Sequence, residues 1–448
     1  TALSGNTTAS GNTALGQNTM TANTTGTRNL AIGFAAYNSS DTENDNLAIG
    51  YDAMTTNTAG GTRNVAVGNY SEDALTSGDK NIGVGYGSLS AVTTGSENVG
   101  IGDNALGQLT TTNGNTALGS NAGFAVAGAS NTAIGQYALQ AATTTNDNTA
   151  VGASALTANT GGASNTGIGS GSLATNTTGG YNTAIGAGAL TASTTGNNNV
   201  AVGRNALNSL TTAAENVAVG TNALATNQTA IRNVAVGHEA LTASTTGYNN
   251  TCVGYVAGKA ITQGYQNTFI GDRAGTAITT GDNNTAVGQN ALKASVTAGN
   301  NVAVGMDAAT LVSTGAQTTA IGCFAGDTTT TGNYNIMIGY QARASSATAS
   351  NQITLGNTTN DNLRCNDTSI SSLSDQRDKT NIVDLPLGID FLNTVRPVSF
   401  DWNRRDGSMA GKKDFGFVAQ ELKIAADATD YSDHMRLVHD DNPDKLEA

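Results

Sequence analysis

The sequence predicts an all-β protein, a parallel β-solenoid (β-roll) with coils of about 17 residues, followed by a small α+β domain. A short phrase, Asn-Thr-Ala-Ile-Gly at 182–186, returns one period later as Asn-Val-Ala-Val-Gly at 199–203. The final glycine of this phrase, here called the marker glycine, occurs 21 times between Gly16 and Gly356, and 18 of the 20 intervals are 17 residues long. Side chains before each marker glycine alternate in size, which predicts one short strand per coil.

The predicted strand has two different faces. The residue before the marker glycine is Ile, Val or Leu in all 21 copies, the third residue before it is Thr, Val, Leu or Ile, and the residue between is usually Ala. One coil holds about three sizeable aliphatic side chains, worth roughly 1.5–3 kcal/mol each when buried. Ordering its backbone costs about 1–2 kcal/mol per residue, so a coil is not stable alone. We therefore interpret the flat face, with Ala184, Ala201, Ala218 and Ala235, as a contact with other chains in a side-by-side homotrimer.

Asparagine stands four residues before the marker glycine in 19 of 21 copies, the exceptions being Thr318 and Gln352. Stacked coils would place these side chains above one another, so that their amides could hydrogen-bond along the axis as a ladder. Alternatively, each asparagine serves only its own turn, since Asn tolerates left-handed backbone angles. The marker glycine is expected at a corner that a Cβ would obstruct.

The composition limits the classes of function. Of 448 residues, 12% are charged and 5% are aromatic, with 56 glycines and 3 prolines. A strict register argues against disorder. The net charge of −13 gives no basic surface for nucleic acid, so no nucleic-acid partner is predicted.

Neither the cysteines nor the histidines form a recognisable site. Cys252 takes a slot that usually holds Ala, which predicts a buried small side chain. The three cysteines give no paired framework: Cys252, Cys323 and Cys365. The three histidines lack metal-ligand spacing, so no metal site and no cofactor are predicted: His238, His434 and His439.

Three regions are predicted: a repetitive solenoid shaft at 1–356, a neck at 357–373 and a second domain at 374–448. All three prolines, the single Trp and half of the 20 Lys and Arg residues lie beyond Ser374. In the second domain we expect a helix at 389–395, a hairpin of strands at 398–402 and 415–419 with its turn at 406–407, and a helix at 420–426. Because the chain starts within the repeat, we expect an N-terminal attachment region to be missing.

The repeat phrase Asn-x-Ala-Val/Ile-Gly-x-x-Ala-Leu resembles the head repeats of trimeric autotransporter adhesins and similar repeats of phage fibres. This resemblance implies a left-handed parallel β-roll in which three chains pack side by side. Some tyrosines are expected to be exposed on the coils, where they could stack on sugars or be ordinary surface residues: Tyr37, Tyr51, Tyr70, Tyr181 and Tyr248.

The segments at 374–382, 396–402 and 416–422, with sequences SDQRDKTNI, RPVSFDW and GFVAQEL, resemble the intramolecular chaperone domain of phage endosialidases and tail fibres. The resemblance implies a domain that trimerises, registers three solenoid chains and releases itself by autoproteolysis. It further implies Ser374 as nucleophile, Lys379 as its base and cleavage of the Ser374–Asp375 bond. A lysine can act as a base only if its pKa is lowered by burial or a neighbouring cation. From the residues alone, Ser374 could equally be a cap and Lys379 a solvated charge.

That family continues into a long C-terminal helix, which we expect to be missing from a chain ending at Ala448.

Together, the two resemblances predict a receptor-binding phage tail fibre or spike shaft in the virion tail, assembled in the host cytoplasm. Expected partners are other tail proteins, through the missing N-terminal region, and a host surface glycan or protein. A bacterial trimeric surface adhesin is the alternative. Glycosidases need paired carboxylates, but the solenoid's acidic residues are few and single, so at most self-cleavage by a Ser–Lys peptidase is expected.

Overall fold

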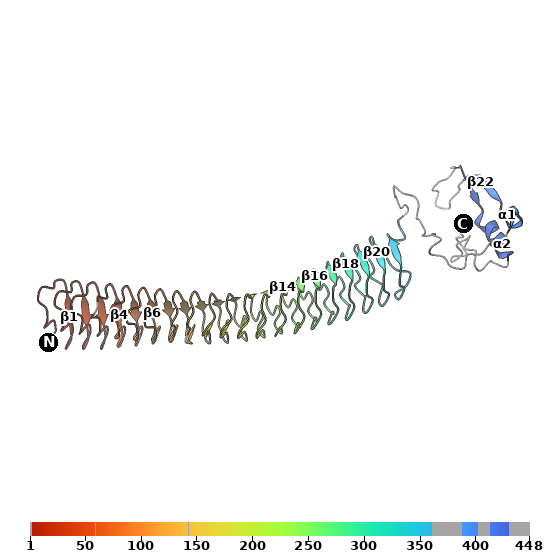
Figure 1. Cartoon of the computed structure of the whole chain (residues 1–448). Coiled ribbons are helices and arrows are strands. Elements are labelled where there is room, and N and C mark those ends of the chain that lie inside the picture. Colours follow the sequence, from red (N-terminus) through yellow and green to blue (C-terminus); the bar gives the residue numbers. More distant parts are fainter. Residues whose placement is uncertain (1, 59, 142, 361–387, 402–412, 430–448) are drawn as a thin grey trace. The chain divides into compact units, whose positions relative to one another are not determined.

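A computed structural model describes residues 2–58, 60–141, 143–360, 388–401 and 413–429. The chain divides into two compact units, Thr1–Leu363 and Arg364–Ala448. The first unit is a stack of coils with a strand in each coil, as Figure 1 shows. The predicted parallel β-solenoid is therefore confirmed.

The strands of this unit are all three residues long. They are β1 (Thr13–Leu15), β2 (Leu30–Ile32), β3 (Leu47–Ile49), β4 (Val65–Val67), β5 (Ile82–Val84), β6 (Val99–Ile101), β7 (Thr116–Leu118), β8 (Thr132–Ile134), β9 (Thr149–Val151), β10 (Thr166–Ile168), β11 (Thr183–Ile185), β12 (Val200–Val202), β13 (Val217–Val219), β14 (Val234–Val236), β15 (Thr251–Val253), β16 (Thr268–Ile270), β17 (Thr285–Val287), β18 (Val302–Val304), β19 (Thr319–Ile321), β20 (Ile336–Ile338) and β21 (Ile353–Leu355).

Each strand pairs in parallel with the strand of the next coil, and together they form one 21-stranded sheet. The register brings every residue onto its counterpart in the following repeat, so that Ala184 pairs with Ala201 and Ile185 with Val202. The two irregular intervals do not disturb it, because Leu47 pairs with Val65 and Thr116 with Thr132. One sequence repeat therefore forms one coil.

The marker glycine follows each strand at a corner where a side chain cannot fit. Gly186 and Gly203 have φ angles of +136° and +131°, which L side chains rarely adopt. A Cβ on Gly203 would lie 2.6 Å from the carbonyl oxygen of Gly220 in the next coil. The recurrence of glycine thus reflects both the backbone angle and the close approach of neighbouring coils.

Replacing Gly203 with Ala should destabilise the surrounding coils by roughly 1–3 kcal/mol or more, because strain and overlap add. Faster amide hydrogen exchange in β11, β12 and β13 would report this local opening. Gly161→Ala is the matched control, since the nearest atom to its added Cβ, Thr178 Cγ2, lies at an ordinary 3.4 Å. Equal protection factors in the two variants would contradict the prediction.

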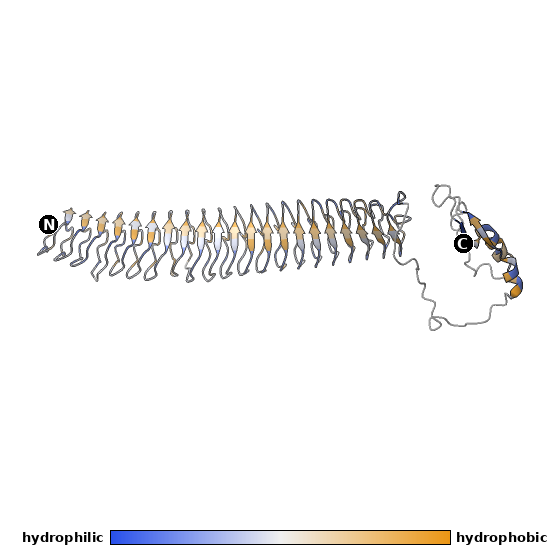
Figure 2. Ribbon diagram, turned by 90° about the horizontal axis from the view of Figure 1, so that it is seen from above, coloured by the Kyte–Doolittle hydropathy of each residue, from blue (hydrophilic) through white to orange (hydrophobic). Residues whose placement is uncertain are grey.

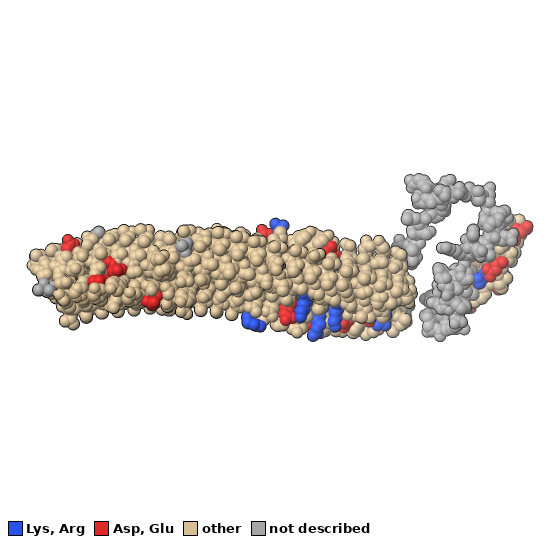
Figure 3. Space-filling model, turned by 90° about the horizontal axis from the view of Figure 1, so that it is seen from below, with Lys and Arg blue, Asp and Glu red and all other residues tan. Residues whose placement is uncertain are grey.

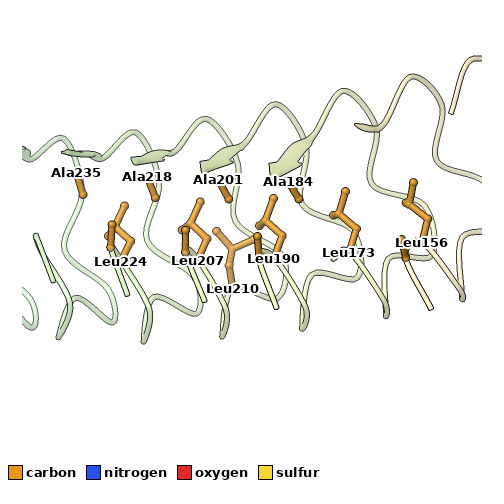
Figure 4. Close-up of a cluster of buried hydrophobic side chains, with 14 of the residues drawn as sticks. Leu156, Leu173, Ala184, Leu190, Ala201, Leu207, Leu210, Ala218, Leu224 and Ala235 are labelled. Carbon is orange, nitrogen blue, oxygen red and sulfur yellow. The ribbon is translucent and has the colours of Figure 1, made fainter. Parts of the chain in front are cut away.

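The alanines of the strands lie inside the coil, contrary to the sequence-based prediction. Ala184, Ala201 and Ala218 are fully buried, and Figure 4 shows them facing a row of leucines that includes Leu190 and Leu207. The prediction that this flat face packs against other chains is wrong. A 17-residue coil is too narrow for large side chains from both walls, so the strand supplies the small one. A bulky residue at Ala218 would overpack the coil's own interior.

Where a larger residue replaces the strand alanine, a glycine replaces a leucine that would contact it, so the coil interior stays filled without overlap. Phe269 occupies the alanine slot of β16 and is fully buried, while Gly275 replaces the leucine that would face it. A Cβ on Gly275 would lie 2.5 Å from Phe269 Cε2. Met337 and Gly326 show the same exchange, with 2.7 Å between Met337 Cε and the Cβ position of Gly326. Cys252 occupies another alanine slot and is fully buried, as predicted.

The buried asparagines form the predicted ladder. The backbone N–H of Asn81 donates to Asn64 Oδ1 at 2.8 Å, and Asn81 Nδ2 donates to the same oxygen at 3.2 Å. Asn81 Nδ2 also donates to the carbonyl oxygen of Gly95, 2.8 Å away in the following turn. At the first exception, the Thr318 N–H still donates to Asn301 Oδ1 at 2.8 Å. The asparagines therefore join coil to coil rather than serving only their own turns.

The second unit contains α1 (Ile389–Thr394), β22 (Pro397–Asp401), β23 (Lys413–Phe417) and α2 (Ala419–Asp427). Strands β22 and β23 are antiparallel, with Ser399 opposite Phe415. These elements confirm the predicted small α+β region. The predicted turn at 406–407 lies outside the described residues.

Candidate functional site

The strands present a continuous row of aliphatic side chains, one from each coil. We call the side chains one and three residues before each marker glycine the outer strand face. They point away from the coil interior, and in β11 they are Thr183 and Ile185, of which Ile185 is 39% exposed. Figure 2 shows the strands as a mostly apolar row along the stack. Charged side chains are sparse on the solenoid surface seen in Figure 3.

One side of this sheet is covered by its own coils, while the outer strand face is open in the single chain. Purely parallel sheets occur almost always with both faces covered. Large exposed apolar patches mark interaction surfaces. The outer strand face is therefore a candidate assembly surface, and it is the opposite face of the strand from the one that the sequence analysis selected.

In the second unit, an ion pair joins two of the segments that the sequence analysis singled out. Arg396, just before β22, contacts Glu421 of α2 through two hydrogen bonds of 3.0 and 2.5 Å. This contact lowers the pKa of Glu421 and raises that of Arg396. Both side chains are solvent-exposed, so the pair orients the hairpin and helix more than it stabilises them.

The described part of the second unit also exposes large apolar side chains. Phe415 of β23 is 83% exposed, Ile424 of α2 is 69% exposed, and Ile389 of α1 is 68% exposed. Such residues lie on every described element except β22, which makes this part of the chain a candidate interaction surface.

The predicted catalytic residues cannot be placed. Ser374, Asp375 and Lys379 lie outside the described residues. The Ser–Lys dyad and the cleaved bond therefore stay predictions.

Part of the second unit is similar to a known protein family. Residues 374–430 match the family model described as chaperone of endosialidase. The matched range begins at Ser374 and includes all four described elements of the second unit. We call residues 374–430 the chaperone segment. No curated protein and no solved structure matches the chain.

A β-solenoid combined with the chaperone segment fits a tail fibre or tail spike. Within the described ranges, no helix has the length and apolar character needed to cross a bilayer. The same residues hold no cluster of three or more His, Cys, Asp or Glu side chains placed to bind a metal ion.

The tyrosines are arranged differently from the sequence-based expectation. Tyr37 is buried inside the coil, where its hydroxyl accepts a hydrogen bond of 2.6 Å from Asn46 Nδ2. Tyr51 and Tyr70 are exposed as expected, but they are not isolated. Together with Phe34 and Tyr86 they form a column of contacting rings. The signal in the sequence was their position: three of the four directly follow a marker glycine.

Proposed function

We propose that this chain is the shaft of a phage tail fibre or spike, a homotrimer that attaches the virion to its host. In this proposal the chains pack through their outer strand faces, and the chaperone segment trimerises and registers them. The chaperone segment then releases itself by cleavage at Ser374–Asp375, with Lys379 as the base. The observation that supports this proposal most is the open apolar face of a parallel sheet, in a chain that also contains the chaperone segment.

A second copy of the same chain is the partner that fits the outer strand face best. The face extends over all 21 strands with a nearly constant repeat length, and an identical chain offers an apolar row of matching length and spacing. The exposed apolar side chains of the chaperone segment fit the same arrangement, because three copies would cover them mutually. The match to a chaperone family favours a fibre over the alternative of a bacterial surface adhesin.

Charged residues on the outer strand face should weaken the trimer. Ile168 and Ile185 are 38% and 39% exposed in the single chain, and the proposal buries them between chains. Changing both to Asp should cost about 3–5 kcal/mol for each charge left buried without a partner. Sedimentation velocity should show a trimer for the wild type, and thermal unfolding should show a lower midpoint for the variant.

Ile231→Asp is the matched control, because Ile231 is 37% exposed but lies outside the outer strand face, in a column that holds Asp282 in another coil. It should unfold within about 0.5 kcal/mol of wild type. A wild-type chain that sediments as a stable folded monomer would refute the proposal, as would equal losses of stability in both variants.

A further inference from the structure

The aromatic column consists of Phe34, Tyr51, Tyr70 and Tyr86, one ring from each of four successive coils. Ring centroids lie 5.2, 5.5 and 5.6 Å apart, and the residues are between 36% and 55% exposed. The first pair is stacked, with 10° between ring planes, and the next two pairs meet edge to face. The column therefore presents an open apolar strip that runs along the stack.

A local irregularity keeps the strip continuous at the third ring. In that coil Asn69 takes the position after the marker glycine, and the ring comes from Tyr70, one residue later. Tyr70 has a φ angle of +58° and contacts the rings on both sides. Asn69 Oδ1 accepts a hydrogen bond from the Tyr51 N–H at 2.9 Å, which holds the shifted loop against the coil below.

The column is distinct from the outer strand face. The position after the marker glycine holds Asp103, Arg204, Asp272 and several Gln, Ser and Ala residues in other coils, whereas the position before it is aliphatic in every coil. When the residue at one position is acidic in some coils, basic in others and small in others, the position is typical of solvent-exposed surface rather than of a uniform contact between chains. Three of four successive coils carry an aromatic residue at this solvent position, and Tyr70 fills the remaining gap from the next position, so the rings need a different partner.

Polar groups beside the rings limit the chemistry of that partner. Partial burial between its neighbours raises the pKa of the Tyr70 hydroxyl, and the charges of Tyr51, Tyr86, Asp52 and Asp73 add to the rise. Asp52 also raises the pKa of Asp73, after the larger effect of burial. Asp52 directly follows Tyr51 and Asp73 lies three residues after Tyr70, so two carboxylates lie near the strip, where they would repel anions and accept hydrogen bonds from hydroxyl groups.

We infer that the aromatic column binds an extended neutral oligosaccharide that lies along the axis of the solenoid. The C–H face of a pyranose stacks on aromatic rings, and the coil-to-coil spacing of the rings is close to the length of one sugar in an extended chain. Sugar hydroxyls would donate to Asp52 and Asp73 and contact the amide of Asn69. This inference rests on the proposed function, because it assigns a ligand class to the attachment role.

Isothermal titration of the full chain tests the inference, with cello-, malto-, manno- and chitohexaose as probes. At least one hexasaccharide should bind, and the double variant Tyr51→Ser/Tyr86→Ser should bind it about tenfold or more weakly. The double variant should fold, because Ser120 and Ser170 occupy the same position in other coils. Tyr181→Ser is the control, since Tyr181 is 68% exposed but lies outside the column, and its binding should be unchanged.

The outcomes separate the possible roles of the rings. Failure of all four sugars to bind, or equal binding by the double variant, would overturn the inference. Sedimentation of the double variant distinguishes a further role, because loss of the trimer would make the column a contact between chains and also overturn it. Adsorption of fluorescent fibre to host cells tests the proposed function separately: if wild type and double variant adsorb equally, attachment stands and the column is not its site.

Discussion

When the protein is expressed and assembles, it should appear as a large fragment that ends at Ser374. The Ser374→Ala variant should keep its full mass and still form trimers, because folding and cleavage are separate steps. Lys379→Ala should also stay uncut, since the hydroxyl would lose its base, and the rate should fall by more than about a thousandfold in both variants. Intact-mass spectrometry measures the fragment, and sedimentation measures the trimer.

Two further variants sharpen this test. Lys379→Arg keeps the positive charge but cannot be deprotonated, so it should stay uncut if lysine is the base. Ser372→Ala removes a hydroxyl two residues away and should be cut like the wild type. Unchanged cleavage in Ser374→Ala, or a wild type that keeps its full mass after trimer assembly, would show that the dyad assignment is wrong.

Changing Glu72 to Leu should stabilise the solenoid, most of all above neutral pH. Glu72 occupies a position that holds Leu89 and Leu106 in the next two coils, and its side chain is fully buried. Neither carboxyl oxygen makes a hydrogen bond of good geometry with the described residues. Burial raises the pKa of Glu72 from 4.5 to about 8, and the nearby backbone of Gly83 opposes this rise with a smaller effect.

The raised pKa sets the direction of the pH dependence. Between pH 4.5 and about 8 the folded chain keeps a proton on Glu72 that the unfolded chain releases. Stability therefore falls as pH rises through this window, by up to about 1.4 kcal/mol per pH unit, and levels off above it. Glu72→Gln should remove this slope. Glu72→Leu should remove it and also add apolar burial, since Leu89 packs beside Gly100 much as Glu72 lies beside Gly83.

Hydrogen exchange of β4 and β5 amides at pH 5 and pH 8, corrected for intrinsic exchange rates, measures this effect. Glu97→Gln is the control, because the Glu97 side chain is 62% exposed and should leave the slope unchanged. A wild-type solenoid that is equally stable at both pH values would contradict the prediction.

The sequence predicted the coils well because the repeat constrains each position many times over. The marker glycine, the buried asparagine and the strand before the glycine all appear where the period placed them. The orientation of the strand was predicted wrongly, because alternation reveals two faces but not which of them points inward. The decisive quantity was the width of the coil, which leaves room only for a residue such as Ala218 opposite a leucine.

Other features depend on contacts between coils and could not be read from a single repeat. Met337 fits because Gly326 of the preceding coil lies against its side chain, a pairing visible only once the coils are stacked. The aromatic column likewise needs the register of neighbouring coils, since Tyr70 reaches it from a shifted position. In the chaperone segment, the order of helices and strands followed from ordinary periodicity and turn signals. The roles of Ser374 and Lys379 rest on resemblance.

The asparagine ladder has a direction. The Oδ1 atom of Asn64 accepts from the N–H of Asn81 in the next coil, while its Nδ2 atom donates both to Asn46 Oδ1 in the preceding coil and to Gly78 in the following turn. A coil at the C-terminal end of the stack would therefore keep a buried amide oxygen that no following N–H reaches. That end of the ladder needs a terminator. Gln352 supplies it: its N–H satisfies Asn335, and its longer amide bonds within its own coil to Ser345.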